Sequence, residues 1–144
     1  MSTPYRHTQR GTMMIAALGL GAMLAAYLAF THPVPELRWL LIALSLAFAV
    51  LAWLFSSLTV EVRAQELRWH FGPGFWRYRL ALAEIAGIAP VRNSWLNGFG
   101  IRMRPRFRLY NVSGLDAVEL RLRSGEVRRI GTDDPQGLAA ALKP

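Results

Sequence analysis

Two long apolar segments near the start of the chain, residues 12–30 and 39–57, contain no charged residue. At a rise of 1.5 Å per residue, about 20 helical residues cross a hydrocarbon core of about 30 Å. Backbone groups inside lipid must be satisfied within the segment, so both segments are predicted to be transmembrane helices.

The eight residues between the segments, 31–38, hold Pro33 and Pro35, which disfavour a continuous helix and predict a tight turn. The result is a helical hairpin. A cleaved signal peptide is the competing interpretation of the first segment, because Arg6 and Arg10 precede it. The segment is long for such a peptide and a second span follows at once, which favours the hairpin.

Small residues recur every fourth position in both segments, at Ala17, Gly21, Ala25, Ala29, Ala43 and Ala47. This spacing lets helices approach closely in lipid. Packing of the two spans against each other explains it most simply, and homodimerisation is the alternative.

After residue 57 the apolar period changes from helical to two. Alternation of apolar and polar residues over five to seven positions predicts half-buried strands. The alternating or strand-like runs are residues 58–63, 67–71, 76–80, 85–91, 101–104, 107–112, 118–123 and 127–130. Turn signals separate several of them: Gly72-Pro73-Gly74, Asn97-Gly98 and Ser124-Gly125. We expect about seven strands.

A short helix is predicted to end the chain. Asp134 can cap its first turn and Pro135 suits the first helical position. The apolar stripe of this helix consists of Leu138, Ala141 and Leu142.

The chain is basic, with a formal net charge of +8 over 144 residues. Arg6 and Arg10 precede the first span, Arg63 and Arg68 follow the second, and only Arg38 lies in the connecting loop. By the positive-inside rule, both termini face the cytoplasm. The expected organisation is a cytoplasmic tail (1–11), a transmembrane hairpin (12–57) and a cytoplasmic β domain (58–144).

The β region resembles the bacterial pleckstrin-homology-like (PH-like) domains of small membrane proteins. The runs that carry the resemblance are residues 58–62, 67–77, 82–88, 97–104, 109–125 and 128–138. The resemblance implies an α+β membrane protein, in which a strongly bent antiparallel sheet or partly open barrel is capped by the C-terminal helix. It also implies binding rather than chemistry.

Arginine occupies every second position from residue 102 to residue 108. In an extended strand these side chains would lie on one face, about 6.6 Å apart. Guanidinium groups pair with phosphate or carboxylate in bidentate fashion, so this arginine ridge is a candidate anion site. A solvated sheet face explains the same pattern. The candidate residues, with two from an earlier strand, are Arg77, Arg79, Arg102, Arg104, Arg106 and Arg108.

Catalytic and metal chemistry find no support in the sequence. The chain has no cysteine, and His7, His32 and His70 lack the spacing of metal ligands. No motif predicts an enzyme or a cofactor. Nucleic acid is the weaker anionic partner, because the aromatic residues near the arginines alternate towards the core.

The sequence therefore predicts a multi-pass bacterial inner-membrane protein that displays a non-enzymatic PH-like adaptor or scaffold. Its expected partners are the lipid bilayer, anionic lipid headgroups, and a membrane protein or a second copy of the chain. An accessory subunit or assembly factor of a larger membrane complex is the alternative.

Overall fold

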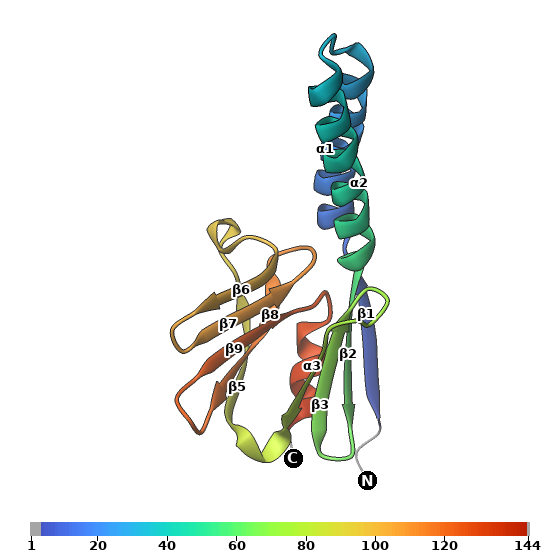
Figure 1. Ribbon diagram of the computed structural model, residues 1–144. Helices are drawn as coiled ribbons and strands as arrows, with labels where there is room; N and C mark the ends of the chain where they lie inside the picture. The colour runs from blue at the N-terminus through green and yellow to red at the C-terminus, as the bar shows by residue number, and fades with distance from the viewer. Residues whose placement is uncertain (1–3, 144) are drawn as a thin grey trace.

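The computed structural model describes residues 4–143, in which a helical hairpin projects from one end of an α+β domain (Figure 1). The elements before the domain's main part are β1 (Tyr5–Arg10), α1 (Thr12–Thr31) and α2 (Pro35–Leu54). The strands that follow are β2 (Ser57–Arg63), β3 (Glu66–Phe71), β4 (Arg77–Ala81), β5 (Ile85–Arg92), β6 (Gly100–Arg104), β7 (Phe107–Asn111), β8 (Asp116–Leu122) and β9 (Val127–Gly131). The 3-10 turns η1 (Leu82–Glu84) and η2 (Trp95–Asn97) flank β5, and α3 (Pro135–Leu142) comes last.

Helices α1 and α2 are each 20 residues long and apolar enough to cross a membrane. The turn between them is shorter than predicted, because Pro35 occupies the first turn of α2 rather than the loop. Helix α2 also ends earlier than predicted, at Leu54, and Ser57 already begins β2.

The small residues of α1 pack against α2. Ala25 and Ala29 are the buried residues of the helix, and a Cβ on Gly21 would lie 3.0 Å from the Phe48 ring. The Ser45 hydroxyl donates a hydrogen bond of 2.8 Å to the carbonyl of Ala22. Packing within the hairpin thus accounts for much of the small-residue spacing in α1. In α2, Ala43 and Ala47 are exposed instead.

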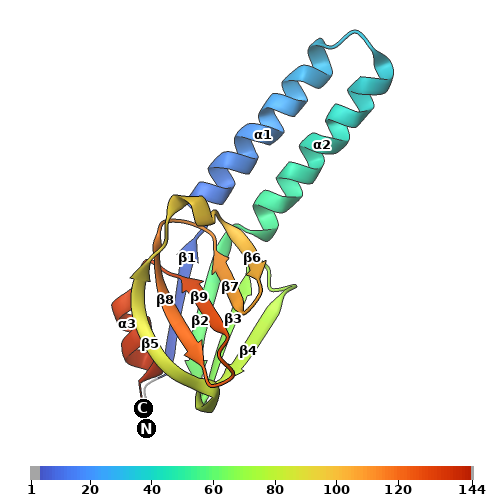
Figure 2. The same cartoon turned by 90° about the vertical axis from the view of Figure 1, so that its left-hand side faces the viewer.

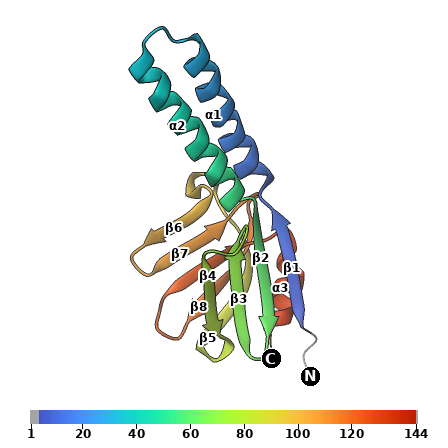
Figure 3. The ribbon, with the colours of Figure 1, turned by 45° about the vertical axis from the view of Figure 1, so that its right-hand side comes forward.

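Strand β1 was not expected from the sequence, which assigned residues 1–11 to a tail. It pairs antiparallel with β2 from Tyr5 opposite Val62 to Arg10 opposite Ser57. The helical hairpin is therefore inserted between two paired strands of one sheet, and both strands continue the helices into the domain (Figure 3).

The strands form two sheets rather than one bent sheet or a closed barrel. The four-stranded sheet has the order β1-β2-β3-β4 and the five-stranded sheet the order β5-β8-β9-β7-β6. All pairs are antiparallel except β7 with β9, which is parallel, so the expected all-antiparallel arrangement is wrong at this pair. Eight strands follow the hairpin where about seven were predicted.

The core lies between the two sheets. Aromatic rings dominate its middle, where Trp69, Tyr78 and Tyr110 pack with centroid separations of 4.8–5.5 Å. Helix α3 contributes Leu138, Ala139 and Leu142 to this core. The predicted cap is confirmed: the Asp134 side chain accepts a hydrogen bond of 3.0 Å from the Gly137 amide, and Pro135 follows it.

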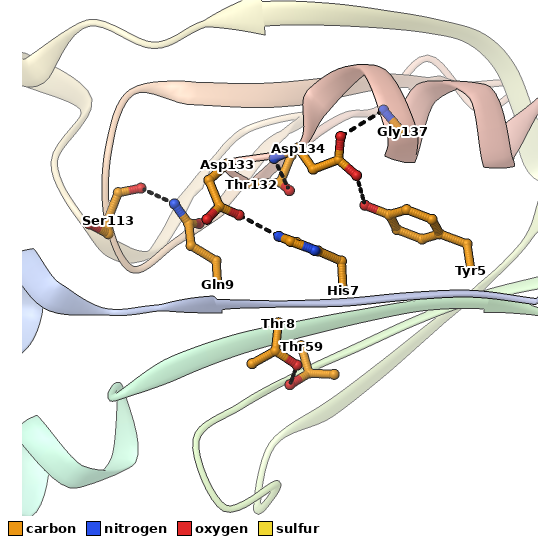
Figure 4. Close-up of polar contacts among 10 residues, drawn as sticks. All are labelled: Tyr5, His7, Thr8, Gln9, Thr59, Ser113, Thr132, Asp133, Asp134 and Gly137. Carbon is orange, nitrogen blue, oxygen red and sulfur yellow. Dashed lines mark hydrogen bonds and ion pairs between the residues drawn. The ribbon is translucent and has the colours of Figure 1, made fainter.

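Polar side chains of β1 connect the sheet to the C-terminal segment and to the loop between β7 and β8 (Figure 4). The Tyr5 hydroxyl donates to Asp134 Oδ2 at 3.0 Å, His7 pairs with Asp133, and the Gln9 amide donates to the Ser113 carbonyl at 2.9 Å. These contacts close the side of the sandwich on which β1 lies.

Candidate functional site

The outer face of the four-stranded sheet carries a basic pocket of about 450 Å³. Its lining holds four arginines and one glutamate, so its formal charge is +3 with histidine neutral. We call this pocket the arginine groove. Its lining residues are Arg6, Thr59, Glu61, Arg68, Trp69, His70, Arg77, Tyr78 and Arg79.

The groove residues of β1, β2, β3 and β4 form two cross-strand rows, which follow from the register of the strands. In one row Arg6 lies opposite Glu61, Glu61 opposite Arg68, and Arg68 opposite Arg79. In the row nearer the hairpin, Thr8 lies opposite Thr59, Thr59 opposite His70, and His70 opposite Arg77. Residues directly opposite each other share one face, so both rows point away from the core.

The charges of the groove are only partly compensated. Arg68 donates two hydrogen bonds, of 2.9 and 2.7 Å, to Glu66, and Arg77 donates one of 2.9 Å to the Gly74 carbonyl. Within residues 4–143, no carboxylate lies within 4.0 Å of a guanidinium nitrogen of Arg6, Arg77 or Arg79. Arg68 and Arg79 lie directly opposite each other, and like charges at such positions repel. Glu66 compensates Arg68, so Arg79 is the member of this pair without a carboxylate partner in the described residues.

Tyr78 lies on β4 between Arg77 and Arg79, and its side chain packs against the core. Burial, together with the neighbouring Tyr110, raises the pKa of Tyr78 above its ordinary value, although Arg108 opposes the shift. Its hydroxyl therefore stays protonated near neutral pH and can donate a hydrogen bond.

The predicted arginine ridge does not share one face. Across the β6–β7 hairpin, Arg102 lies opposite Leu109 and Met103 opposite Arg108. Arg108 therefore lies on the face of Met103, not on that of Arg102. The cause is the two-residue turn at Pro105 and Arg106, where Arg106 has φ 58° and the chain reverses direction.

Carboxylates neutralise several arginines of the five-stranded sheet. Glu126 lies 3.4 Å from Arg108 and 2.7 Å from Arg128. The hydrogen bond from Arg128 is the main reason that the pKa of Glu126 is lowered, and the charges of Arg128 and Arg108 add to it, whereas burial opposes the shift. Arg108 is thus committed to an internal ion pair.

Of the six predicted site residues, the structure brings only Arg77 and Arg79 into the groove. Arg102 and Arg104 lie on the exposed face of β6 in the other sheet. The groove residues that the sequence analysis missed as a site are Arg6 and Arg68. Both occupy outward positions of strands, but only the register shows that Arg68 lies opposite Arg79 and that Arg6 lies in the same cross-strand row. Strand β1 itself was not predicted.

A scan of protein-family models matches none of them to this chain, and a search of curated proteins finds no similar sequence. Functional inference therefore depends on the geometry of the groove and its position relative to the hairpin.

Proposed function

We propose that this chain is a bacterial inner-membrane protein whose hairpin spans the bilayer and whose PH-like domain is a non-enzymatic binding module on the cytoplasmic side. The arginine groove binds anionic lipid headgroups, and the domain serves as an adaptor or scaffold at the membrane face. The observation that carries the proposal is that four arginines line one open pocket and that three of them, Arg6, Arg77 and Arg79, have no carboxylate partner in the described residues.

The height of the groove relative to the hairpin supports a lipid ligand. Its nearer row contains Thr59, two residues beyond Ser57 and therefore about 7 Å further along the strand. The headgroup layer adds about 5–8 Å to each side of the hydrocarbon core. If Ser57 lies at the edge of that core, Arg77 lies at the outer limit of the headgroups and its side chain can reach their phosphates.

The arrangement of two sheets with a closing C-terminal helix supports the PH-like assignment. Two features depart from that assignment: the parallel pair β7–β9, and strand β1, which precedes the residues that carry the resemblance. Orientation follows from the basic flanks: Arg6, Arg10, Arg63 and Arg68 all lie on the domain side of the hairpin.

Lipid retention by the full chain tests the proposal. The protein, purified in neutral detergent, is mixed with equal amounts of phosphatidylglycerol and phosphatidylcholine, and bound lipid is measured by native mass spectrometry. We expect an excess of phosphatidylglycerol. Each basic side chain near anionic lipid contributes about 1 kcal/mol, so Arg77→Gln with Arg79→Gln should weaken this binding about 30-fold.

The matched control is Arg102→Gln with Arg104→Gln, which removes the same charge from the other sheet. This variant should retain phosphatidylglycerol like the wild type. Equal retention of the two lipids by the wild type contradicts the proposal. If only the control variant loses phosphatidylglycerol, the lipid site is on β6 and not in the groove. The full chain is required, because a fragment that begins at residue 58 lacks β1 and Arg6.

A second candidate function is that of an accessory subunit or assembly factor of a larger membrane complex. It is favoured by β6, an edge strand of the five-stranded sheet on which Met103 is 63% exposed. An uncovered strand edge offers backbone donors and acceptors to another strand. A stoichiometric protein crosslinked to position 103 in native membranes would support this candidate.

A further inference from the structure

Large apolar side chains gather at the hairpin end of the β domain, outside the groove. They come from the end of α2, the β3–β4 loop and the turn η2, and all are exposed. We call them the aromatic rim: Trp53, Phe75, Trp76, Trp95 and Leu96.

The β3–β4 loop is fixed against the base of α2. The amide of Gly72 donates a hydrogen bond of 2.8 Å to the Ser57 carbonyl, and a Cβ on Gly72 would lie 2.4 Å from the Leu54 carbonyl oxygen. The Phe75 ring meets the Trp53 ring edge-on, with centroids 6.0 Å apart. Phe75 is therefore level with the last turn of α2, yet 68% exposed.

The turn η2 reaches the same level from the other sheet. It joins β5 to β6 and lies at the hairpin end of the domain, at about the level of the base of the helices (Figure 1 and Figure 2). Its own hydrogen bonds hold it: Ser94 Oγ accepts from the Leu96 amide at 3.3 Å, and the Gly98 amide donates to the Trp95 carbonyl at 3.1 Å. Nevertheless Trp95 is 75% exposed. Such an ordered turn presents its apolar side chains outward.

We propose that the aromatic rim is a second membrane contact, which seats the domain in the lipid interface beside the hairpin. Trp53 belongs both to α2 and to the rim, so the rim is continuous with the apolar surface of the hairpin. Tryptophan is enriched at the boundary between lipid and water, where its ring is amphipathic. Arg10 and Arg92, exposed at the hairpin ends of β1 and β5, supply charges that suit anionic headgroups.

This contact fixes the orientation of the domain. The hairpin alone attaches the domain at one point, through β1 and β2, and leaves it free to tilt. The β3–β4 loop and η2 come from different sheets, so together with the hairpin they give the domain three points of contact with the membrane. Three contacts prevent tilting and hold the arginine groove at a constant distance from the membrane surface. The inference rests on the proposed insertion of the hairpin but not on lipid binding in the groove.

Depth measurements on the full chain test the rim. The chain has no cysteine, so single spin labels can be placed by Leu96→Cys in η2, Ser124→Cys in the β8–β9 turn and Ala43→Cys on the exposed side of α2. In vesicles of phosphatidylglycerol and phosphatidylcholine, collisions with oxygen should exceed collisions with a water-soluble nickel complex at positions 43 and 96. The order should reverse at position 124, at the far end of the domain.

A second variant guards against a local effect of the label. Phe75→Ser with Trp95→Ser should increase collisions of the nickel complex at position 96 and leave position 43 unchanged. If position 96 is as accessible to nickel as position 124 while position 43 lies in lipid, the rim proposal is wrong and the hairpin proposal stands. If position 96 is shielded from both reagents, protein covers the rim and the lipid assignment is wrong. Nickel access at position 43 overturns membrane insertion and the rim together.

Discussion

The Tyr5 hydroxyl donates a hydrogen bond of 3.0 Å to Asp134 Oδ2, and so joins two residues separated by 129 positions. The other oxygen of the same carboxylate accepts a bond of 3.0 Å from the Gly137 amide. One side chain thus caps α3 and ties it to β1 (Figure 4). Burial, the hydrogen bond and the charge of Asp134 raise the pKa of Tyr5, which keeps its hydroxyl a donor at physiological pH.

Replacing Asp134 with alanine should destabilise the domain by about 2 kcal/mol, because it removes a helix cap and the partner of Tyr5 together. Tyr5→Phe, which removes only the second bond, should cost about 1 kcal/mol. Thermal unfolding of the full chain in mild detergent, followed by tryptophan fluorescence, measures both. Asp116→Ala is the control, since this exposed carboxylate makes no side-chain hydrogen bond in the described residues. A loss no larger than that of the control contradicts the prediction.

The junction between α2 and the β3–β4 loop should be intolerant of a side chain at Gly72. This residue has φ +43°, and a Cβ there would lie 2.4 Å from the Leu54 carbonyl oxygen. Gly125, with φ +87°, has no atom within 4 Å of such a Cβ. Gly125→Ala should therefore cost only the backbone strain of about 1–2 kcal/mol, and Gly72→Ala clearly more. Equal changes in the unfolding temperature would show that the close approach to α2 does not matter.

Acid should weaken the domain through Glu119. Burial raises the pKa of this carboxyl, but the hydrogen bonds and charges of Arg129 and Arg121 outweigh burial and lower it below 4.5. A lowered pKa contributes stability that is fully present at neutral pH and is lost as pH falls through the folded-state pKa. Glu119→Gln should be less stable at pH 7 and should lose less stability on acidification. Glu84→Gln, at an exposed position, serves as the comparison, and parallel pH profiles of Glu119→Gln and wild type would refute the assignment.

The hairpin offers a matched pair of substitutions. Ala29 is fully buried against α2, so Ala29→Leu should overpack the interface and cost about 1–3 kcal/mol. Ala43 is exposed on the other helix, and Ala43→Leu should leave thermal stability and oligomeric state unchanged. A change of oligomeric state on Ala43→Leu would support homodimerisation through the outward face of α2.

The sequence predicted those elements whose signals are local. Both helices follow from length and absence of charge, and most strands after Leu58 follow from alternation. Strand β1 has no apolar alternation to reveal it. The side chains that it turns inward, Tyr5, His7 and Gln9, are polar, and each makes a polar contact with a residue more than 100 positions away. Only the folded chain brings these partners together.

The candidate site was less predictable than the fold, because it depends on register. Alternation indicated that Arg102 and Arg108 would share a face, but a two-residue turn between them reverses the assignment of faces in the second strand. Conversely, Arg6 and Arg79 lie on one face of one sheet although 73 positions separate them. The linear pattern does not show which residues of different strands share a cross-strand row.

Strands β1 and β2 pair although the hairpin separates them in the chain, so folding of the domain depends on how the two helices enter the membrane. If only one of the two helices crossed the bilayer, the membrane would separate Tyr5 from Val62, and their strands could not meet. The first sheet would then have an open flank, and α3 would lack its partner on β1. Under the proposed membrane insertion, a chain in which a single helix has crossed the bilayer cannot form this sheet, so such a chain should remain sensitive to protease until the second helix has been inserted.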